Sequence, residues 1–194
     1  MKKHIFLAGR AGIGKSELIR EVLGDKAAYA GGMITEQSCD EDGNFIGYEL
    51  LPAAACVVGR DKFDAQLYLD CHSFPPLKDN EVFRNYGAQL LTEAQYYSFA
   101  MADEIGSFEI IIPQFRAALE EFLNLDIPII GALADTENVR FLKESFGLGS
   151  KVNLYTQNLR AQLEKHPDTS VIELTAYNRD AVKSALAEWA KEFL

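Results

Sequence analysis

"HIFLAGRAGIGKSELIREVLG", residues 4–24, is the stretch that decides the fold. It opens with a short apolar run, which is typical of a buried strand. From Lys15 onward, apolar side chains recur at helical spacing until Gly24, a helix end signal. Between strand and helix lies Gly-x-x-x-x-Gly-Lys-Ser, residues 9–16. A glycine-rich loop in this context predicts a site that binds phosphate groups.

Each part of this loop has a chemical role in that prediction. The glycines allow backbone conformations that side chains disfavour, so successive N–H groups can point at a phosphate. Lys15 is expected to reach the β- and γ-phosphates, and the Ser16 hydroxyl to bind Mg²⁺. The predicted nucleotide-binding residues are Gly9, Arg10, Ala11, Gly12, Ile13, Gly14, Lys15, Ser16 and Glu17.

Glu17 is unusual in a phosphate-binding loop, where this position commonly carries Ser or Thr. The helix dipole attracts a carboxylate there in the empty protein, but the same carboxylate repels a bound polyphosphate. We therefore expect Glu17 to weaken nucleotide binding without abolishing it. For Arg10 two interpretations stay open: a solvated surface arginine, or a group that offsets this repulsion or approaches the γ-phosphate.

Composition narrows the class of protein. The 194 residues are expected to form one domain, residues 1–194, with 48% hydrophobic and 25% charged residues. A net charge of −10 argues against a surface for nucleic acid or for anionic lipid. No apolar run reaches the roughly 18 residues of a membrane span. Three widely spaced cysteines, with neither a C-x-x-C nor a secretion signal, favour a reduced, cytoplasmic protein.

Apolar strands alternate with helices along the rest of the chain, which predicts an α/β fold with a mostly parallel sheet covered on both faces. A β-hairpin is expected after the first helix, around the turn at residues 40–44. Further strands are predicted at 53–59, 65–70, 127–134, 151–156 and 170–175, with mostly loop over 60–85. Helices are predicted from about Glu93, from Pro113, over 137–147, over 157–165 and from about Asn178.

The adjacent acids of "ADEIG", residues 102–106, are the candidates for the remaining chemistry. Hydrolysis of a nucleotide needs a second acidic site for the metal ion and a group that orients the attacking water. Asp103 suits the first role and Glu104 the second. The alternative is a solvated acidic pair at the end of a helix.

Several motifs together resemble those of the cancer-related nucleoside-triphosphatase family of P-loop proteins. They occur in the family's order: "GRAGIGKS" (9–16), "GGMITEQ" (31–37), "NYG" (85–87), "DEIGSFE" (103–109) and "IELTAYNRD" (172–180). The resemblance implies a three-layer, RecA-like P-loop NTPase fold and Mg²⁺-dependent hydrolysis of nucleoside triphosphates, ATP or GTP. It makes Lys15 and Glu104 the candidate catalytic residues, and Ser16 and Asp103 the candidate metal ligands.

The chain departs from the family pattern just before Asp103. Only residues 88–102 separate "NYG" from "DEIG", which is short for a helix, a turn and a strand. The stretch "YYSFAMA", residues 96–102, also continues a helical pattern. We therefore expect Asp103 not to lie at the end of a central strand. In addition, Ser107 stands where the family favours lysine.

Asn178, Arg179 and Asp180 open the last predicted helix, and two interpretations of them stay open. A polar trio after a parallel strand can contact the base or ribose at the carboxyl edge of a sheet. Asn178 can equally serve as a helix cap, which needs no ligand.

Three functions compete at this level. The leading one is a Mg²⁺-dependent nucleoside triphosphatase, with turnover left open by Glu17 and the short segment. A nucleotide or small-molecule kinase is less favoured, because a lid over 59–85 offers only Arg60 and Arg84. The third is a nucleotide-binding regulator or degenerate relative without significant turnover. The sequence indicates no base preference, protein partner, oligomeric state or arginine supplied in trans.

Overall fold

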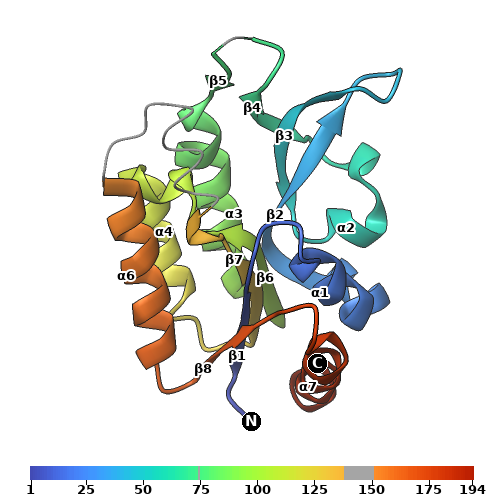
Figure 1. The fold of residues 1–194 in the computed structure, drawn as a ribbon, viewed down its shortest axis with the longest axis vertical. Coiled ribbons are helices and arrows are strands. Elements are labelled where there is room, and N and C mark those ends of the chain that lie inside the picture. The colour runs from blue at the N-terminus through green and yellow to red at the C-terminus, as the bar shows by residue number, and fades with distance from the viewer. Residues whose placement is uncertain (74, 138–150) are drawn as a thin grey trace.

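The computed structural model describes residues 1–73, 75–137 and 151–194, and its strands form one eight-stranded sheet (Figure 1). The sheet order is β5-β4-β3-β2-β6-β7-β1-β8. The strands are β1 (His4–Ala8), β2 (Ala30–Cys39), β3 (Phe45–Pro52), β4 (Gln66–Asp70), β5 (Leu77–Lys78), β6 (Phe99–Ile105), β7 (Ile129–Leu133) and β8 (Thr169–Glu173).

The sheet has a parallel part and an antiparallel extension. Strands β8, β1, β7, β6 and β2 pair in parallel, whereas β3, β4 and β5 continue from β2 in antiparallel pairs. All residues of β1 and β7 are buried, as expected for parallel strands covered on both faces. The mostly parallel sheet and the hairpin after the first helix are therefore confirmed.

Helices cover both faces of this sheet. The α-helices are α1 (Lys15–Leu23), α2 (Ala55–Val58), α3 (Ala88–Glu93), α4 (Pro113–Phe122), α6 (Lys151–Lys165) and α7 (Arg179–Phe193). Short 3₁₀ or π-helical turns are η1 (Gly24–Tyr29), η2 (Arg60–Lys62), η3 (Val82–Gly87), η4 (Ala94–Tyr96) and η5 (Phe108–Ile111). In the described part of the chain, none of them combines the length and apolarity needed to cross a membrane.

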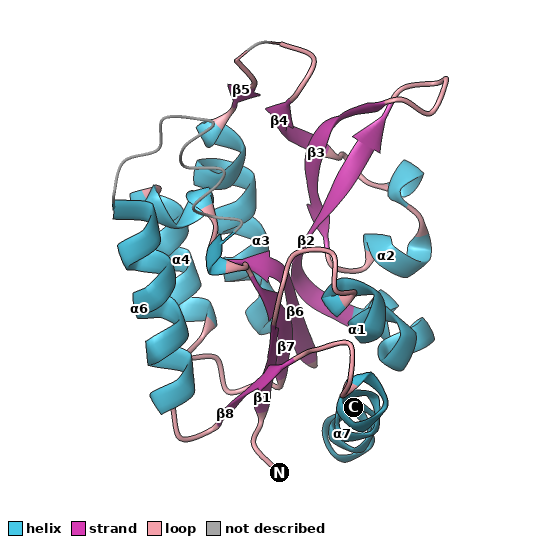
Figure 2. Ribbon diagram, viewed as in Figure 1, coloured by secondary structure: helices cyan, strands magenta, loops and turns pink. Residues whose placement is uncertain are grey.

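The layers follow from the alternation of side chains along the strands. Figure 2 shows α3, α4 and α6 on one side of the sheet, and α1 and α7 on the other. In β1, Phe6 and Ala8 belong to the core on the side of α4, while Ile5 and Leu7 belong to the core under α1 and α7. The three-layer α/β fold is thus confirmed.

The segment before Asp103 differs from the prediction. Helical backbone already runs over Val82–Gly87, so "NYG" lies inside the helix and not ahead of it. The helix ends with α3, and one 3₁₀ turn leads into β6, with Asp103 at the carboxyl end of that central strand. The predicted helix from Glu93 and the helical interpretation of 96–102 are wrong. A short apolar run such as Phe99–Ala102 has no periodicity that separates strand from helix.

Two of the predicted strands are also wrong. Residues 53–59 contain the short helix α2 in place of a strand, in keeping with the high helix propensity of alanine. Residues 151–156 open α6, whose buried Val152, Thr156, Leu159 and Leu163 keep one helical period throughout. Strand β4 and the helix beginning at Pro113 are confirmed. From residue 138 onward, the helix predicted over 137–147 lies outside the described residues.

Trp189 anchors α7 to the sheet. Its side chain is fully buried, and its indole Nε1–H donates a hydrogen bond of 2.9 Å to the Lys3 carbonyl at the start of β1. The ring lies in the same apolar core as Leu18 and Ile19 of α1. The helix that follows "NRD" is therefore held against the strand that precedes the glycine loop.

We predict that Trp189→Ala lowers the free energy of unfolding by about 3 kcal/mol or more, because it leaves a large cavity and an unpaired carbonyl. Urea denaturation followed by circular dichroism measures the change. Tyr177→Ala, at a fully exposed position, is the control and should stay within about 0.5 kcal/mol of the wild type. Equal losses in the two variants would contradict the anchoring role.

Candidate functional site

The glycine loop joins the carboxyl end of β1 to the first turn of α1. Gly9, Gly12 and Gly14 have φ values of 138°, 73° and 91°, in the region that side chains rarely adopt. A Cβ atom at Gly9 would also lie 2.6 Å from the Leu174 carbonyl oxygen. The loop therefore has the backbone shape for which the sequence pattern requires glycine.

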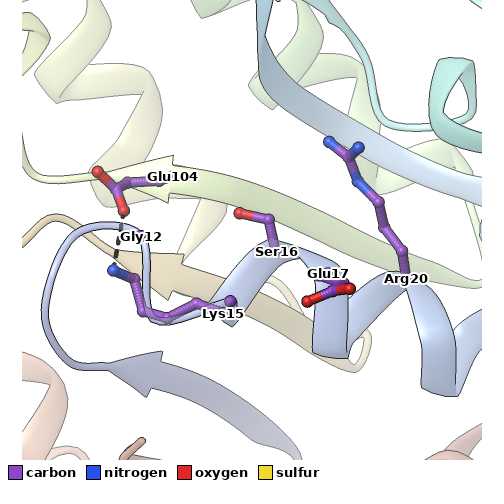
Figure 3. A pocket seen from close by; sticks show the side chains of 7 residues that line it. Gly12, Lys15, Ser16, Glu17, Arg20 and Glu104 are labelled. Atoms are coloured by element: carbon purple, nitrogen blue, oxygen red, sulfur yellow. Dashed lines mark ion pairs between the residues drawn. The ribbon is translucent and has the colours of Figure 1, made fainter.

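Four polar side chains meet at this loop, and Figure 3 shows Lys15, Ser16 and Glu104 among them. The Ser16 hydroxyl donates a hydrogen bond of 2.8 Å to Asp103 Oδ1. Lys15 Nζ lies 3.2 Å from Glu104 Oε2 and donates a bond of 2.9 Å to the Gly9 carbonyl. Asp103 and Glu104 stand at the end of β6, which is separated from β1 by β7. The structure thus brings Lys15, Ser16, Asp103 and Glu104 together, against the expectation drawn from the short segment.

A cavity of about 440 Å³ opens over these residues. It is lined by Gly12, Gly14, Lys15, Ser16, Glu17, Arg20 and Glu104. The volume of the cavity suits a polyphosphate, and so does the presence of Lys15 in its lining at the N-terminus of α1. Of the predicted loop residues, Arg10 and Ala11 are exposed, and the Ala11 N–H donates a 3.1 Å bond to Asp135 Oδ2.

The carboxyl group of Asp103 has the features of a cation ligand. Asp103 is only 1% exposed, and burial raises its pKa, while the Ser16 bond and the charges of Arg20 and Lys15 act in the opposite direction. Its Oδ2 atom is buried and has no hydrogen-bond partner among the described residues. A buried carboxylate oxygen beside a hydroxyl is an oxygen donor set that Mg²⁺ accepts.

Two oxygen donors, the Ser16 hydroxyl and the Asp103 carboxyl group, lie together at the loop. Within residues 1–73, 75–137 and 151–194, no group of three or more His, Cys, Asp or Glu side chains is placed to hold a metal. Mg²⁺ in phosphate sites takes only one or two protein carboxylates and completes its shell with water and phosphate oxygens. The residues present therefore fit this ion when a nucleotide is bound.

Glu104 is held in a different environment from Asp103. Its side chain is 30% exposed and borders the cavity. Burial raises its pKa, and the neighbouring Lys15 opposes that rise. An ion pair with the loop lysine thus keeps this carboxylate at the border of the cavity.

Glu17 is paired as well. Arg179 Nη2 lies 3.1 Å from Glu17 Oε2, and Arg179 Nη1 is 3.5 Å from the Gly14 carbonyl. This arginine belongs to "NRD" at the start of α7. It offsets the charge that made Glu17 unfavourable for a polyphosphate.

Asn178 occupies the N-cap position of α7, and its carbonyl accepts a 2.9 Å bond from the Val182 N–H. Its side chain makes no capping bond to the helix. The side-chain Oδ1 instead accepts a 2.7 Å bond from the Thr175 N–H, and Nδ2 donates one of 2.8 Å to the Glu173 carbonyl. Asn178 is therefore the N-cap residue by position, and its side chain holds the loop that precedes Arg179.

Sequence reasoning missed Arg20, Asp135 and Glu109. Arg20 lines the cavity and pairs with Glu36 of β2 at 3.0 Å. Its position one helical turn after Ser16 was the available signal, because i and i+4 share a face. Asp135 follows the buried strand β7, and an acid at the end of such a strand points to the same edge of the sheet as the loop.

Glu109 is a buried carboxyl group that orders the segment after Glu104. It is 3% exposed, and its Oε1 accepts bonds of 2.6 Å from the Gly106 N–H and 2.9 Å from the Ser107 N–H. Burial raises its pKa from 4.5 to about 7, although the backbone bonds oppose the rise. It belongs to "DEIGSFE", but its spacing alone does not reveal this role.

We predict that Glu109 makes the protein less stable as the pH rises. Between pH 4.5 and about 7 the unfolded chain ionises this group while the folded chain keeps its proton, so folding loses stability over that range and levels off above it. Glu109→Gln cannot ionise, so its unfolding free energy relative to wild type should rise by roughly 1–3 kcal/mol from pH 5 to pH 8.

Urea denaturation at the two pH values measures this difference, with the exposed Glu188→Gln of α7 as the matched control. Parallel pH dependences in wild type and Glu109→Gln would show that the folded protein does not keep the proton on Glu109.

Comparison with known proteins agrees with this geometry. The chain is similar in fold to the crystal structure of THEP1 from the hyperthermophile Aquifex aeolicus, with a TM-score of 0.66 at 15% identity over 97% of this chain and 99% of that one. At this identity the likeness concerns the fold alone. No curated protein matches the chain. A family model described as NTPase, however, matches residues 4–187. The chain, whose glycine loop meets the acids of β6, therefore belongs to this NTPase family.

Proposed function

We propose that the protein binds a nucleoside triphosphate, ATP or GTP, together with Mg²⁺ and hydrolyses it to the diphosphate and phosphate. The observation that carries this proposal is the meeting of Lys15 and Ser16 with Glu104 and Asp103 at one edge of the sheet. The proposal includes a cytoplasmic location and a place beside the cancer-related nucleoside triphosphatases, supported by the shared "DEIG" and "NRD" motifs.

Binding begins with the loop. Backbone N–H groups at the start of α1 face the phosphates, and the helix dipole adds favourable charge. Lys15 exchanges its contact with Glu104 for the β- and γ-phosphates. Ser16 and Asp103 are the residues that would hold Mg²⁺, directly or through water. The bound ion would neutralise the negative charge on the phosphate oxygens.

Glu104 acts on the water. Once Lys15 turns to the phosphates, the Glu104 carboxylate is free to accept a hydrogen bond from a water molecule in line with the γ-phosphorus. The water oxygen bonds to phosphorus, the bond to the bridging oxygen breaks, and the proton passes toward Glu104. The nucleoside diphosphate leaves with the electron pair of the broken bond.

The alternative of a binder without turnover loses its main support. It rested on the segment before Asp103 being too short to place the acids. Because the helix begins before "NYG", that segment does place Asp103 within 2.8 Å of the Ser16 hydroxyl. The second argument against turnover was the repulsion between Glu17 and a bound polyphosphate, and the ion pair of Glu17 with Arg179 reduces that repulsion.

We predict opposite effects for the two members of the Lys15–Glu104 pair. Lys15→Ala should weaken nucleotide binding by about tenfold or more, through loss of a charged hydrogen-bond donor. Glu104→Gln should bind nucleotide at least as well as wild type, because it no longer competes for Lys15, yet lose turnover by about 100-fold. Equilibrium binding and phosphate release, both with Mg²⁺, measure the two properties.

Glu188→Gln is the matched control, since it removes an exposed carboxylate of α7. Phosphate release from Glu104→Gln at the wild-type rate would remove Glu104 from the reaction. Absence of nucleotide binding by the wild type at millimolar concentration would reject the proposed function.

We also predict that Arg179→Ala weakens nucleotide binding about two- to fivefold, since Glu17 is largely exposed and its pairing energy is correspondingly modest. Glu17→Thr in the same background should restore affinity, because it removes the unpaired charge. Lys183→Ala, which breaks the neighbouring pair with Glu21 on the same two helices, is the control. If Glu17→Thr changes affinity in neither background, Glu17 does not repel the nucleotide.

A further inference from the structure

A second cavity, of about 370 Å³, adjoins the phosphate site. The two cavities share Gly12 and Glu104 in their linings. The second one extends away from α1, toward the antiparallel strands β3 and β4 and the turns η3 and η5. A molecule in it would have the Glu104 carboxylate at one end, on the side of the phosphate loop.

Its walls are aromatic. Tyr48, Tyr68, Phe83 and Phe108 line it. The ring centroids of Tyr68 and Phe83 are 4.8 Å apart, and those of Phe83 and Phe108 are 5.7 Å apart, both in edge-to-face arrangements. Because these rings pack against each other, the walls are already formed without a ligand. They offer flat apolar surface of the kind that contacts a planar ring.

Polar groups occur at defined places in this lining. Glu109, Thr35 and Ser107 contribute to it together with the hydroxyl-bearing Tyr68 and Tyr48. The two backbone bonds of Glu109 both use Oε1, which leaves Oε2 outside them. A buried carboxyl group in an apolar pocket is suited to form a hydrogen bond with a ring nitrogen, an amide or a hydroxyl.

Hydrolysis does not explain a cavity of this kind. An attacking water needs room for one molecule and polar partners next to Glu104. The volume here lies within the range of small-molecule sites, and aromatic walls bind water poorly. Ser107, where the related motif favours lysine, adds to this space because its side chain is short.

We propose that this cavity binds a small ring-containing alcohol of nucleoside-like size, and that its hydroxyl group takes the γ-phosphoryl group in place of water. The inference rests on the proposed function, since it uses the same nucleotide and the same Glu104. The hydroxyl oxygen bonds to the γ-phosphorus and the bond to the bridging oxygen breaks. The nucleoside diphosphate leaves, and the hydroxyl proton passes toward Glu104.

The competition with water is part of the proposal. A dedicated kinase closes a lid whose arginines converge on the phosphates. Here Arg60 is paired with Glu49, and Arg84 with Glu81, both away from the phosphate cavity. Water therefore keeps access, and both inorganic phosphate and a phosphorylated alcohol are expected as products.

The test follows the fate of the γ-phosphate. Wild-type protein with Mg²⁺ and γ-³²P-labelled ATP or GTP is incubated with millimolar adenosine, guanosine, cytidine, uridine or pyridoxine. Chromatography then separates labelled alcohol phosphate from labelled inorganic phosphate. We expect label in at least one alcohol, and the ratio of the two products to rise with alcohol concentration.

Two variants test whether the alcohol binds in this cavity. Ser107→Lys, which introduces the residue of the related motif, and Tyr48→Ala, in the part of the lining that β3 contributes, should each lower the product ratio by about tenfold, since each alters the fit of the ring. Tyr96→Ala, at an aromatic position that is 81% exposed, is the matched control and should keep the wild-type ratio. Nucleotide binding and circular dichroism show that each variant is folded.

The outcomes separate this inference from the proposed function. If the wild type releases inorganic phosphate but puts no label in any of the five alcohols, the inference is overturned. The proposed hydrolysis then still stands. Failure to bind nucleotide overturns both. Transfer to an alcohol at an unchanged ratio in Ser107→Lys and Tyr48→Ala overturns the placement in this cavity.

Discussion

The burial of the Asp103 carboxyl group against the Ser16 hydroxyl is the constraint on which the rest of the site depends. A carboxylate removed from water is unfavourable unless hydrogen bonds or cations compensate it. Here one oxygen accepts the Ser16 bond and the charges of Arg20 and Lys15 lie nearby, while the other oxygen is unpartnered among the described residues. Helix α1 and strand β6 are thereby tied together across β7, and the incomplete compensation leaves an oxygen for a cation.

The charged side chains around the loop also compensate one another in ion pairs. Lys15 is paired with Glu104, Glu17 with Arg179, and Arg20 with Glu36. In each of these three pairs, an acid is matched by a base from another element. Only the Lys15–Glu104 pair consists of two groups that both have a use in the proposed reaction, so it is the pair that a nucleotide has to separate.

The strand, glycine loop and helix at residues 4–24 were predictable because their signals are local: an apolar run, glycines with special φ values and a regular helical period. The position of Asp103 was not, because it depends on where an earlier helix begins. "NYG" looks like a boundary, yet Phe83 and Leu91 are buried on one helical segment that runs through it. The role of Glu109 was not predictable, because the partners of its carboxyl group are backbone N–H groups, which leave no trace in the side-chain pattern.

Trp189 has a further consequence as the only tryptophan of the chain. It lies in the core under α1 and α7, whereas the aromatic cavity belongs to the opposite side, with Tyr68, Phe83 and Phe108 in the other core. Indole emission therefore reports whether the helix layer of α1 and α7 is intact, and it does so from the side of the sheet that does not carry the aromatic cavity.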